Sequence, residues 1–211
     1  MMKPLPYILA LVALPYLLNQ VRKPTKWTGR FFLWMMNLSH AGLTDWGLTH
    51  VTIGKAFTIL DVGCGGGRTI GKLAAIATES MVHGVDYANG SVAASRAAVK
   101  AGRVAIAQAS VSRLPFPADT FDLVTAVETQ YYWPDLVKDM QEVLRVLKPG
   151  GTLLVIAESY ATGKSRIKLP NFARLSVDEH HDLFLTAGYQ QIQVFEERRK
   201  GWLCATGAKS L

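Results

Sequence analysis

From residue 57 to residue 207, short apolar runs alternate with stretches in which apolar residues recur every three or four positions. The short runs predict buried strands, and the wider spacing predicts amphipathic helices. The predicted strands cover residues 57–62, 81–85, 103–107, 121–127, 152–157, 191–196 and 202–207. The predicted helices cover residues 66–77, 89–101, 135–147 and 176–187.

This alternation predicts an α/β domain with a mainly parallel sheet, because a helix usually supplies the crossover between two parallel strands. No helix separates the last two predicted strands, which are joined only by residues 197–201. Such a short link favours a hairpin, which introduces an antiparallel strand. The expected fold class is therefore α/β and doubly wound, with a mainly parallel seven-stranded sheet and a C-terminal antiparallel hairpin.

The chain before residue 55 follows a different pattern. Residues 4–18 carry no charge, and basic residues follow them between positions 22 and 30. The apolar run is shorter than the roughly 20 residues that span a bilayer, and prolines interrupt it. Three hypotheses follow: a monotopic membrane anchor, a helix packed on the domain, or a short spanning segment.

The apolar spacing between residues 31 and 52 predicts one or two amphipathic helices before the sheet. We therefore divide the chain into an N-terminal apolar segment and helical cap, residues 1–54, and a main domain, residues 55–211. With 49% hydrophobic and 18% charged residues, the 211-residue chain has the composition of a folded globular protein.

The charge and cysteine content narrow the picture only slightly. The 23 basic and 16 acidic residues give a net charge of +7, which suits acidic substrates, nucleic acid or an anionic membrane without choosing among them. Cys64 and Cys204 form no metal-binding pair, so we expect free thiols. A reducing, cytoplasmic location follows, with membrane association if residues 4–18 are an anchor.

Candidate chemistry begins with the run Asp61-Val62-Gly63-Cys64-Gly65-Gly66-Gly67, which follows the first predicted strand. Glycines let a backbone approach a ligand closely, and a helix that begins near Gly66 offers free backbone N–H groups. A small anionic or zwitterionic ligand is therefore expected there. The spacing differs from G-x-G-x-x-G, and Arg68 stands where a phosphate-binding loop needs Lys.

A second acid, Asp86, ends the second predicted strand. An acid at the carboxyl end of this strand can accept hydrogen bonds from the hydroxyls of a ribose. The alternative is a helix N-cap, which either Asp86 or Asn89 can supply. The nearby glycine turn favours the ribose interpretation.

These strings resemble motifs of the class I, Rossmann-like methyltransferases that depend on S-adenosylmethionine (SAM). The spacing Asp61-x-Gly63-x-Gly65-x-Gly67 is similar to their first motif. Residues 145–151, Arg-Val-Leu-Lys-Pro-Gly-Gly, resemble a later structural motif that ends a helix and reverses the chain before the fifth strand. The resemblance covers roughly residues 55–208, in the small-molecule, type 11-like branch. It implies a Rossmann-like fold, SAM as cofactor and S-adenosylhomocysteine as product.

The resemblance also implies a set of residues that bind the cofactor. These residues are Asp61, Gly63, Cys64, Gly65, Gly67, Asp86, Tyr87, Ser110, Val111 and Glu128. Ser110 stands where relatives often have an Asp that binds adenine, so a side-chain contact is not carried over to it. A backbone contact through Val111 is unaffected by that substitution.

The candidate catalytic residues follow the fourth predicted strand and are Glu128, Tyr131 and Tyr132. Glu128 can orient an acceptor or take a proton, and the tyrosine rings can contact the sulfonium or an apolar acceptor. The alternative is that the rings pack the loop and Glu128 caps the next helix. Many relatives carry His at Tyr131 or Tyr132, so this loop supplies no histidine base. No metal-binding cluster is visible in the sequence, and no metal is assigned.

The resemblance therefore implies a SAM-dependent methyltransferase that moves a methyl group to an N, O, S or C atom of a small molecule by in-line displacement. Two other hypotheses are a membrane-associated enzyme acting on a lipid, quinone or thiol, and a non-catalytic SAM-binding partner protein. A SAM-using isomerase or cyclase is a further alternative. A nucleic-acid enzyme is disfavoured because residues 128–131 lack the Asn/Asp-Pro-Pro-Tyr/Phe motif. The sequence leaves the acceptor and the oligomeric state open.

Overall fold

The computed structural model describes residues 41–99, 102–159 and 175–211. Residues 4–18, which carry the three membrane and packing hypotheses, lie outside the described residues, as do residues 31–40. Of the helical cap predicted before the sheet, the described part contains α3 (Ala41–Leu48).

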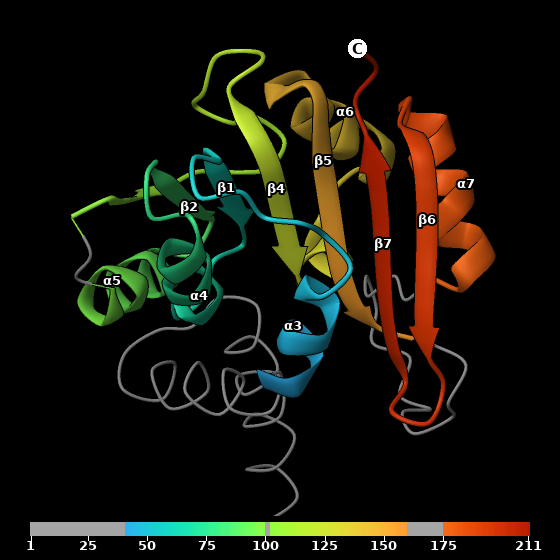
Figure 1. Ribbon diagram of the computed structural model, residues 1–211, viewed down its shortest axis with the longest axis horizontal. Helices are drawn as coiled ribbons and strands as arrows, with labels where there is room; N and C mark the ends of the chain where they lie inside the picture. The colour runs from blue at the N-terminus through green and yellow to red at the C-terminus, as the bar shows by residue number, and fades with distance from the viewer. Residues whose placement is uncertain (1–40, 100–101, 160–174) are drawn as a thin grey trace, which may run out of the picture.

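The described strands form one seven-stranded sheet in the order β3-β2-β1-β4-β5-β7-β6 (Figure 1). The strands are β1 (Ile59–Val62), β2 (Val82–Asp86), β3 (Val104–Gln108), β4 (Phe121–Val127), β5 (Leu147–Glu158), β6 (Gln190–Glu197) and β7 (Trp202–Ala208). Strands β1 to β5 are mutually parallel, whereas β7 runs antiparallel to both β5 and β6. The predicted α/β fold and its C-terminal hairpin are confirmed.

Helices cover both faces of this sheet, as in a doubly wound Rossmann-like fold (Figure 1). The α-helices after α3 are α4 (Arg68–Ile76), α5 (Asn89–Ala98), α6 (Leu136–Val146) and α7 (Val177–Ala187). Helices α3, α4 and α5 lie on one face, and α6 and α7 lie on the other. A short 3₁₀ helix, η1 (Gln130–Tyr132), follows β4.

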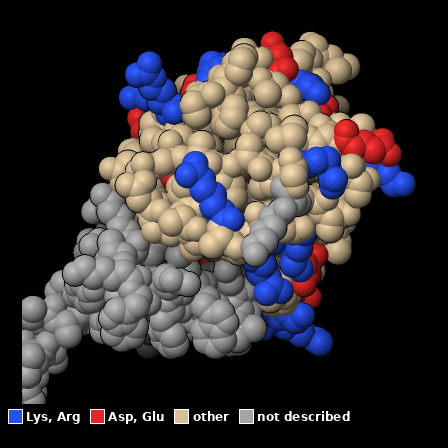
Figure 2. All heavy atoms as spheres, turned by 90° about the vertical axis from the view of Figure 1, so that its left-hand side faces the viewer, with Lys and Arg blue, Asp and Glu red and all other residues tan. Residues whose placement is uncertain are grey.

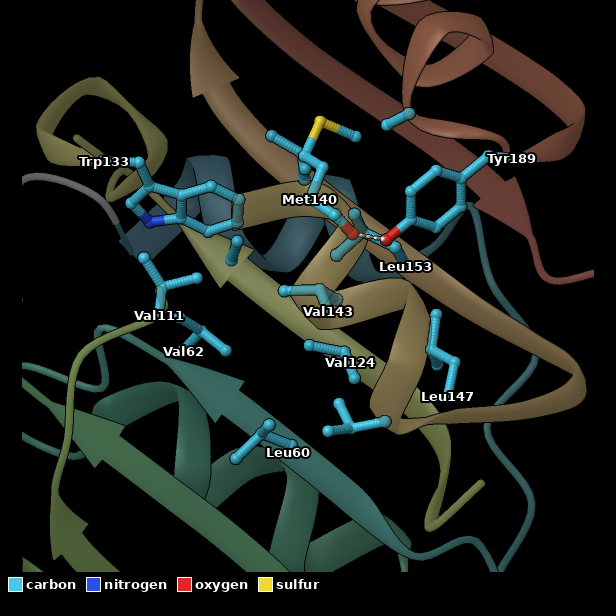
Figure 3. Close-up of a cluster of buried hydrophobic side chains, with 14 of the residues drawn as sticks. Leu60, Val62, Val111, Val124, Trp133, Met140, Val143, Leu147, Leu153 and Tyr189 are labelled. Carbon is cyan, nitrogen blue, oxygen red and sulfur yellow. Dashed lines mark hydrogen bonds between the residues drawn. The ribbon is translucent and has the colours of Figure 1, made fainter. Parts of the chain in front are cut away.

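Two apolar clusters anchor these layers because successive strand residues point to opposite faces. Ile59 packs in the cluster beneath α4, whereas its neighbour Leu60 packs in the cluster beneath α6 and α7. Figure 3 shows the second cluster, in which the hydroxyl of Tyr189 donates to the backbone oxygen of Met140 at 2.9 Å. The sheet is therefore held from both sides, and its strand ends are free to carry chemistry.

The start of the fifth strand differs from the prediction. The sequence places a chain-reversing turn at Pro149-Gly150-Gly151 and a strand from residue 152, but β5 begins at Leu147. Leu147 already pairs with Phe121, and the register shifts before the next pair. Gly150 has a φ of +76° and donates its N–H to the oxygen of Lys209. The glycines therefore lie at an irregularity inside a paired strand, which begins directly where α6 ends.

Candidate functional site

The glycine turn joins β1 to α4 at the carboxyl end of the parallel strands. Gly63, Gly65 and Gly67 all have a positive φ, at 76°, 51° and 81°, a region that side chains rarely tolerate. The N–H groups of Gly63 and Cys64 both donate to the oxygen of Val85, at 2.8 and 3.0 Å. The turn is thus fixed to β2, while Gly63 and Gly65 stay partly exposed to a ligand.

The turn is also packed against β4 and α5. A β-carbon on Gly63 would lie 2.6 Å from Cβ of Thr129 and closer still to its Oγ1. A β-carbon on Gly67 would lie 2.6 Å from Oγ of Ser95. These approaches exclude side chains at both positions and bring the residue after Glu128 directly onto the turn.

Asp61 lies at the end of β1 and is only 1% exposed. Its Oδ1 accepts a hydrogen bond from Oγ1 of Thr125 at 2.7 Å, whereas its buried Oδ2 has no partner among the described residues. Burial raises the pKa of Asp61 to about 7, the Thr125 hydrogen bond opposes this rise, and the charge of Asp86 adds to it. A buried acceptor left unpaired is costly, so it suits a ligand that brings an ammonium group.

Asp86 connects the glycine turn to the segment before α5. Its Oδ2 accepts from the N–H of Gly65 at 2.9 Å, and its Oδ1 accepts from the N–H of Ala88 at 2.8 Å. Burial raises the pKa of Asp86, and these backbone hydrogen bonds oppose the rise. The N-cap of α5 is Ala88, so the alternative in which Asp86 or Asn89 caps this helix is wrong. Ser91 also donates a side-chain hydrogen bond to this carboxylate, which has about four acceptor positions in all and therefore keeps acceptor capacity for a hydroxyl donor.

Replacing Asp86 with Ala should weaken SAM binding by about 1–3 kcal/mol, the scale of hydrogen bonds to a charged group. The expected loss combines the ribose contact that the sequence predicts with the hydrogen bond that anchors Gly65. Isothermal titration calorimetry of the folded variant measures it. An unchanged Kd would contradict the ribose assignment.

Cys64 and Val111 direct their side chains into the protein interior. Cys64 packs with Ile70 and Leu73 in the cluster beneath α4, and burial raises the pKa of its thiol above the ordinary range. Val111 belongs to the opposite cluster, near Trp133 (Figure 3). Only the backbones of these two predicted cofactor residues are therefore placed to meet a ligand.

Tyr87 and Ser110 lie nearer the surface. Tyr87, which follows Asp86 in the chain, is 61% exposed. Oγ of Ser110 accepts from the N–H of Ser112 at 3.2 Å, and its backbone oxygen accepts from the N–H of Arg113. The hydroxyl oxygen of Ser110 is therefore hydrogen-bonded within its own loop, whereas Tyr87 is accessible for stacking.

Glu128, Tyr131 and Tyr132 are brought together at the end of β4. Oε1 of Glu128 accepts from the hydroxyl of Tyr131 at 2.7 Å and from the N–H of Glu158 at 2.6 Å. Tyr131 is only 3% exposed, and its ring meets that of Tyr132 edge-on at 6.3 Å. The N-cap of η1 is Thr129 and that of α6 is Asp135, so Glu128 caps neither helix.

Three residues of this region were not among the site residues that the sequence predicts: Thr125, Thr129 and Glu158. Thr125 contacts Asp61 across the β1–β4 pair, Thr129 covers Gly63, and Glu158 meets Glu128 from β5. Each contact joins residues far apart in the chain. Their only sequence signal was a position at or near the carboxyl end of a predicted strand.

A hollow of about 440 Å³ lies far from the glycine turn, near the opposite ends of the strands. Among the residues that line it are Asp122, Thr152 and Thr206. Within residues 41–99, 102–159 and 175–211, no cluster of three His, Cys, Asp or Glu side chains is arranged to hold a metal. In the same ranges, no helix is long and apolar enough to cross a membrane.

Charged side chains on the face shown in Figure 2 form separate groups. Lys and Arg lie among neutral residues and are interspersed with Asp and Glu, with no single continuous basic patch across this view. All 16 acidic residues but only 13 of the 23 basic residues belong to the described part of the chain, so the net charge of +7 is not carried by this face. This arrangement gives no support to a nucleic-acid surface here.

Comparison with protein families gives a match to a model described as a methyltransferase domain, over residues 60–155. The matched segment contains the glycine turn, Asp86, Glu128 and Tyr131. The uncharacterized methyltransferase YdaC of Bacillus subtilis is 26% identical over 178 residues, covering 83% of this chain and 96% of that protein.

A second relative matches a shorter segment of this chain at a higher sequence identity. The ubiquinone/menaquinone biosynthesis C-methyltransferase UbiE of Geobacter sulfurreducens is 36% identical over 114 residues, or 52% of this chain and 44% of that protein. The chain therefore spans less than half the length of this relative.

Solved structures share the fold. A methyltransferase of Haloferax volcanii, in complex with the Trm112 activator, superposes with a TM-score of 0.75 at 21% identity, covering 87% of this chain and 95% of that one. A SAM-dependent methyltransferase from Aquifex aeolicus has a TM-score of 0.66 at 20% identity, covering 78% and 87%.

Proposed function

Because the chain belongs to the class I SAM-dependent methyltransferases, we propose that it transfers the methyl group of SAM to an N, O, S or C atom of a small-molecule acceptor. One observation carries the proposal: the glycine turn lies between two acids, Asp61 and Asp86, at the carboxyl ends of β1 and β2. Of these acids, Asp61 holds a buried oxygen that lacks a partner among the described residues.

The residues at this edge fit SAM. When bound, SAM supplies a methyl group made electrophilic by its sulfonium. Oδ2 of Asp61 would accept from the ammonium group, and the partly exposed backbone of Gly63 and Gly65 would admit the methionine portion. Asp86 would accept from the ribose hydroxyls, and Tyr87 would stack on the adenine.

The chain's part in methyl transfer is mainly to bind and orient. Aligning an acceptor with the methyl group converts a bimolecular reaction into an effectively unimolecular one, which alone contributes about 7–11 kcal/mol in favourable cases. Glu128, Tyr131 and Tyr132 lie at and just after the end of β4, where they would border the acceptor. A strong general base is not required for acceptors that are neutral nucleophiles.

A second candidate is a lipophilic acceptor reached at a membrane. Its support is the name of the Geobacter relative, which refers to ubiquinone and menaquinone biosynthesis, together with the uncharged residues 4–18. In this case residues 4–18 would contact the bilayer while the methyltransferase domain remains outside it.

A turnover screen tests both candidates with the full chain. Release of S-adenosylhomocysteine would be measured with amines, phenols and thiols in solution, and with quinols and fatty acids in detergent micelles. Turnover of a water-soluble class supports the first candidate, and turnover confined to micellar acceptors supports the second. Binding of SAM without turnover of any class would favour the non-catalytic partner role.

A further inference from the structure

Glu128 adopts an unusual backbone conformation at the end of β4. Its φ is +55°, in the left-handed region that costs a residue with a side chain roughly 1–2 kcal/mol. Its N–H nevertheless pairs with the oxygen of Ile156 at 2.8 Å, so the residue remains tied to β5. Such strain persists only where surrounding contacts hold it, and it occurs most often at functional sites.

The side chain of Glu128 supplies these contacts. Its Oε1 accepts from the hydroxyl of Tyr131 and from the N–H of Glu158, and that N–H also lies 2.8 Å from the Tyr131 oxygen. The three groups form a closed triangle between β4, η1 and β5. Burial and the charge of Glu128 raise the pKa of Tyr131 well above its ordinary value, so its hydroxyl remains a donor.

This triangle determines where the next residue lies. Thr129 follows the left-handed kink directly and packs against Gly63, in the space a β-carbon would need. η1 then begins at Gln130 and returns Tyr131 to the Glu128 carboxylate. The conformation of Glu128 is thus connected to the glycine turn through Thr129.

Both donors converge on a single carboxylate oxygen, so the Glu128 side chain ties the end of β4 to η1 and to β5. We propose that Glu128 is a positioning residue: its carboxylate oxygen, held by Tyr131 and Glu158, fixes the kink that seats Thr129 on the cofactor turn. Proton acceptance is not its role. This inference rests on the proposed function and names how one residue of that site acts.

The test compares Glu128→Gln with Glu128→Ala in the full chain. Gln keeps a side-chain oxygen that accepts both donors, so the Kd for SAM should stay within about twofold of wild type. Ala removes the acceptor and should raise the Kd about fivefold or more, the effect of one lost buried hydrogen bond. Removing a general base would instead lower kcat by about 10²–10⁴ in the Gln variant and leave the Kd unchanged.

Tyr131→Phe provides a second arm with a matched control. It removes one donor to Glu128 and should also raise the Kd for SAM. Tyr189→Phe removes an equally buried tyrosine hydroxyl, bonded to Met140 in the core, and should lower thermal stability without changing the Kd. A general loss of stability therefore cannot imitate the expected result.

Hydrogen exchange gives a readout that needs neither cofactor nor acceptor. In the ligand-free protein, the backbone amides of residues 129–133 should exchange faster than in wild type in the Glu128→Ala and Tyr131→Phe variants. In the Glu128→Gln and Tyr189→Phe variants, the same amides should exchange at the wild-type rate. Equal exchange and equal Kd in all variants would overturn the inference, as would a Gln variant that behaves like Ala. A wild-type protein that binds SAM without any turnover would contradict only the proposed function.

Discussion

Replacing Gly65 with Val should raise the Kd for SAM by at least about 30-fold. Gly65 has a φ of +51°, which is especially unfavourable for a β-branched residue, and its N–H holds the Asp86 carboxylate. The left-handed conformation costs about 1–2 kcal/mol and overpacking about 1–3 kcal/mol, and their total of about 2–5 kcal/mol corresponds to a change of at least about 30-fold. The added side chain also occupies the space through which the ligand approaches the backbone.

A matched glycine in the next helix provides the control for this experiment. Gly71 lies on α4, and apart from its own helix no described residue has a heavy atom within 4 Å of the position a β-carbon would take. Gly71→Ala should stabilise the protein by about 0.5–1 kcal/mol and leave the Kd for SAM unchanged. Calorimetry and thermal unfolding of both variants check the result. A folded Gly65→Val protein that binds SAM normally would show that the turn does not hold the cofactor.

Replacing Asp61 with Asn should weaken SAM binding and remove its pH dependence. The amide oxygen can keep the hydrogen bond from Thr125, but the negative charge opposite the ligand's ammonium group is lost. A charge-assisted hydrogen bond contributes about 1.5–3 kcal/mol, so the Kd at pH 8 should rise roughly 10- to 100-fold. The wild-type affinity should increase as the pH rises through about 7, where Asp61 ionises.

The same ionisation predicts how stability changes with pH. Burial raises the pKa of Asp61 from its ordinary value of 3.8 to about 7 in the folded protein. Between these values the unfolded chain releases its proton while the folded chain keeps it, so this group lowers the free energy of unfolding as pH increases. The decline is of the order of 4 kcal/mol from about pH 4 to about pH 7, and Asp61→Asn should abolish it.

Urea denaturation of the ligand-free proteins, from about pH 4 to about pH 8, measures this difference between wild type and variant. The two stability curves should diverge in favour of Asn as the pH rises. Calorimetric titrations with SAM over the upper half of the same pH range measure how the Kd of each protein changes with pH. Parallel stability curves, or a wild-type affinity that does not change with pH, would contradict the assignment of Asp61.

Local sequence patterns predicted most of the framework. The strand ending at Val62, the glycine spacing and Asp86 at the end of β2 were all predicted from short segments, because periodicity and turn chemistry act over a few residues. The start of β5 at Leu147 could not be predicted in this way, because its pairing with Phe121 depends on a neighbouring strand. The inward direction of the Cys64 side chain likewise follows from packing against α4.

The sequence by itself determined the α/β fold, the place of the glycine turn and the acids that flank it. Only the tertiary structure decided how these groups are used: that one oxygen of Asp61 meets Thr125 while the other has no described partner, and that Glu128 is held by Tyr131 and Glu158. The physical reason is separation along the chain. Strand ends distant in sequence meet only when the sheet forms, and hydrogen-bond partners and burial set the chemistry of a carboxylate.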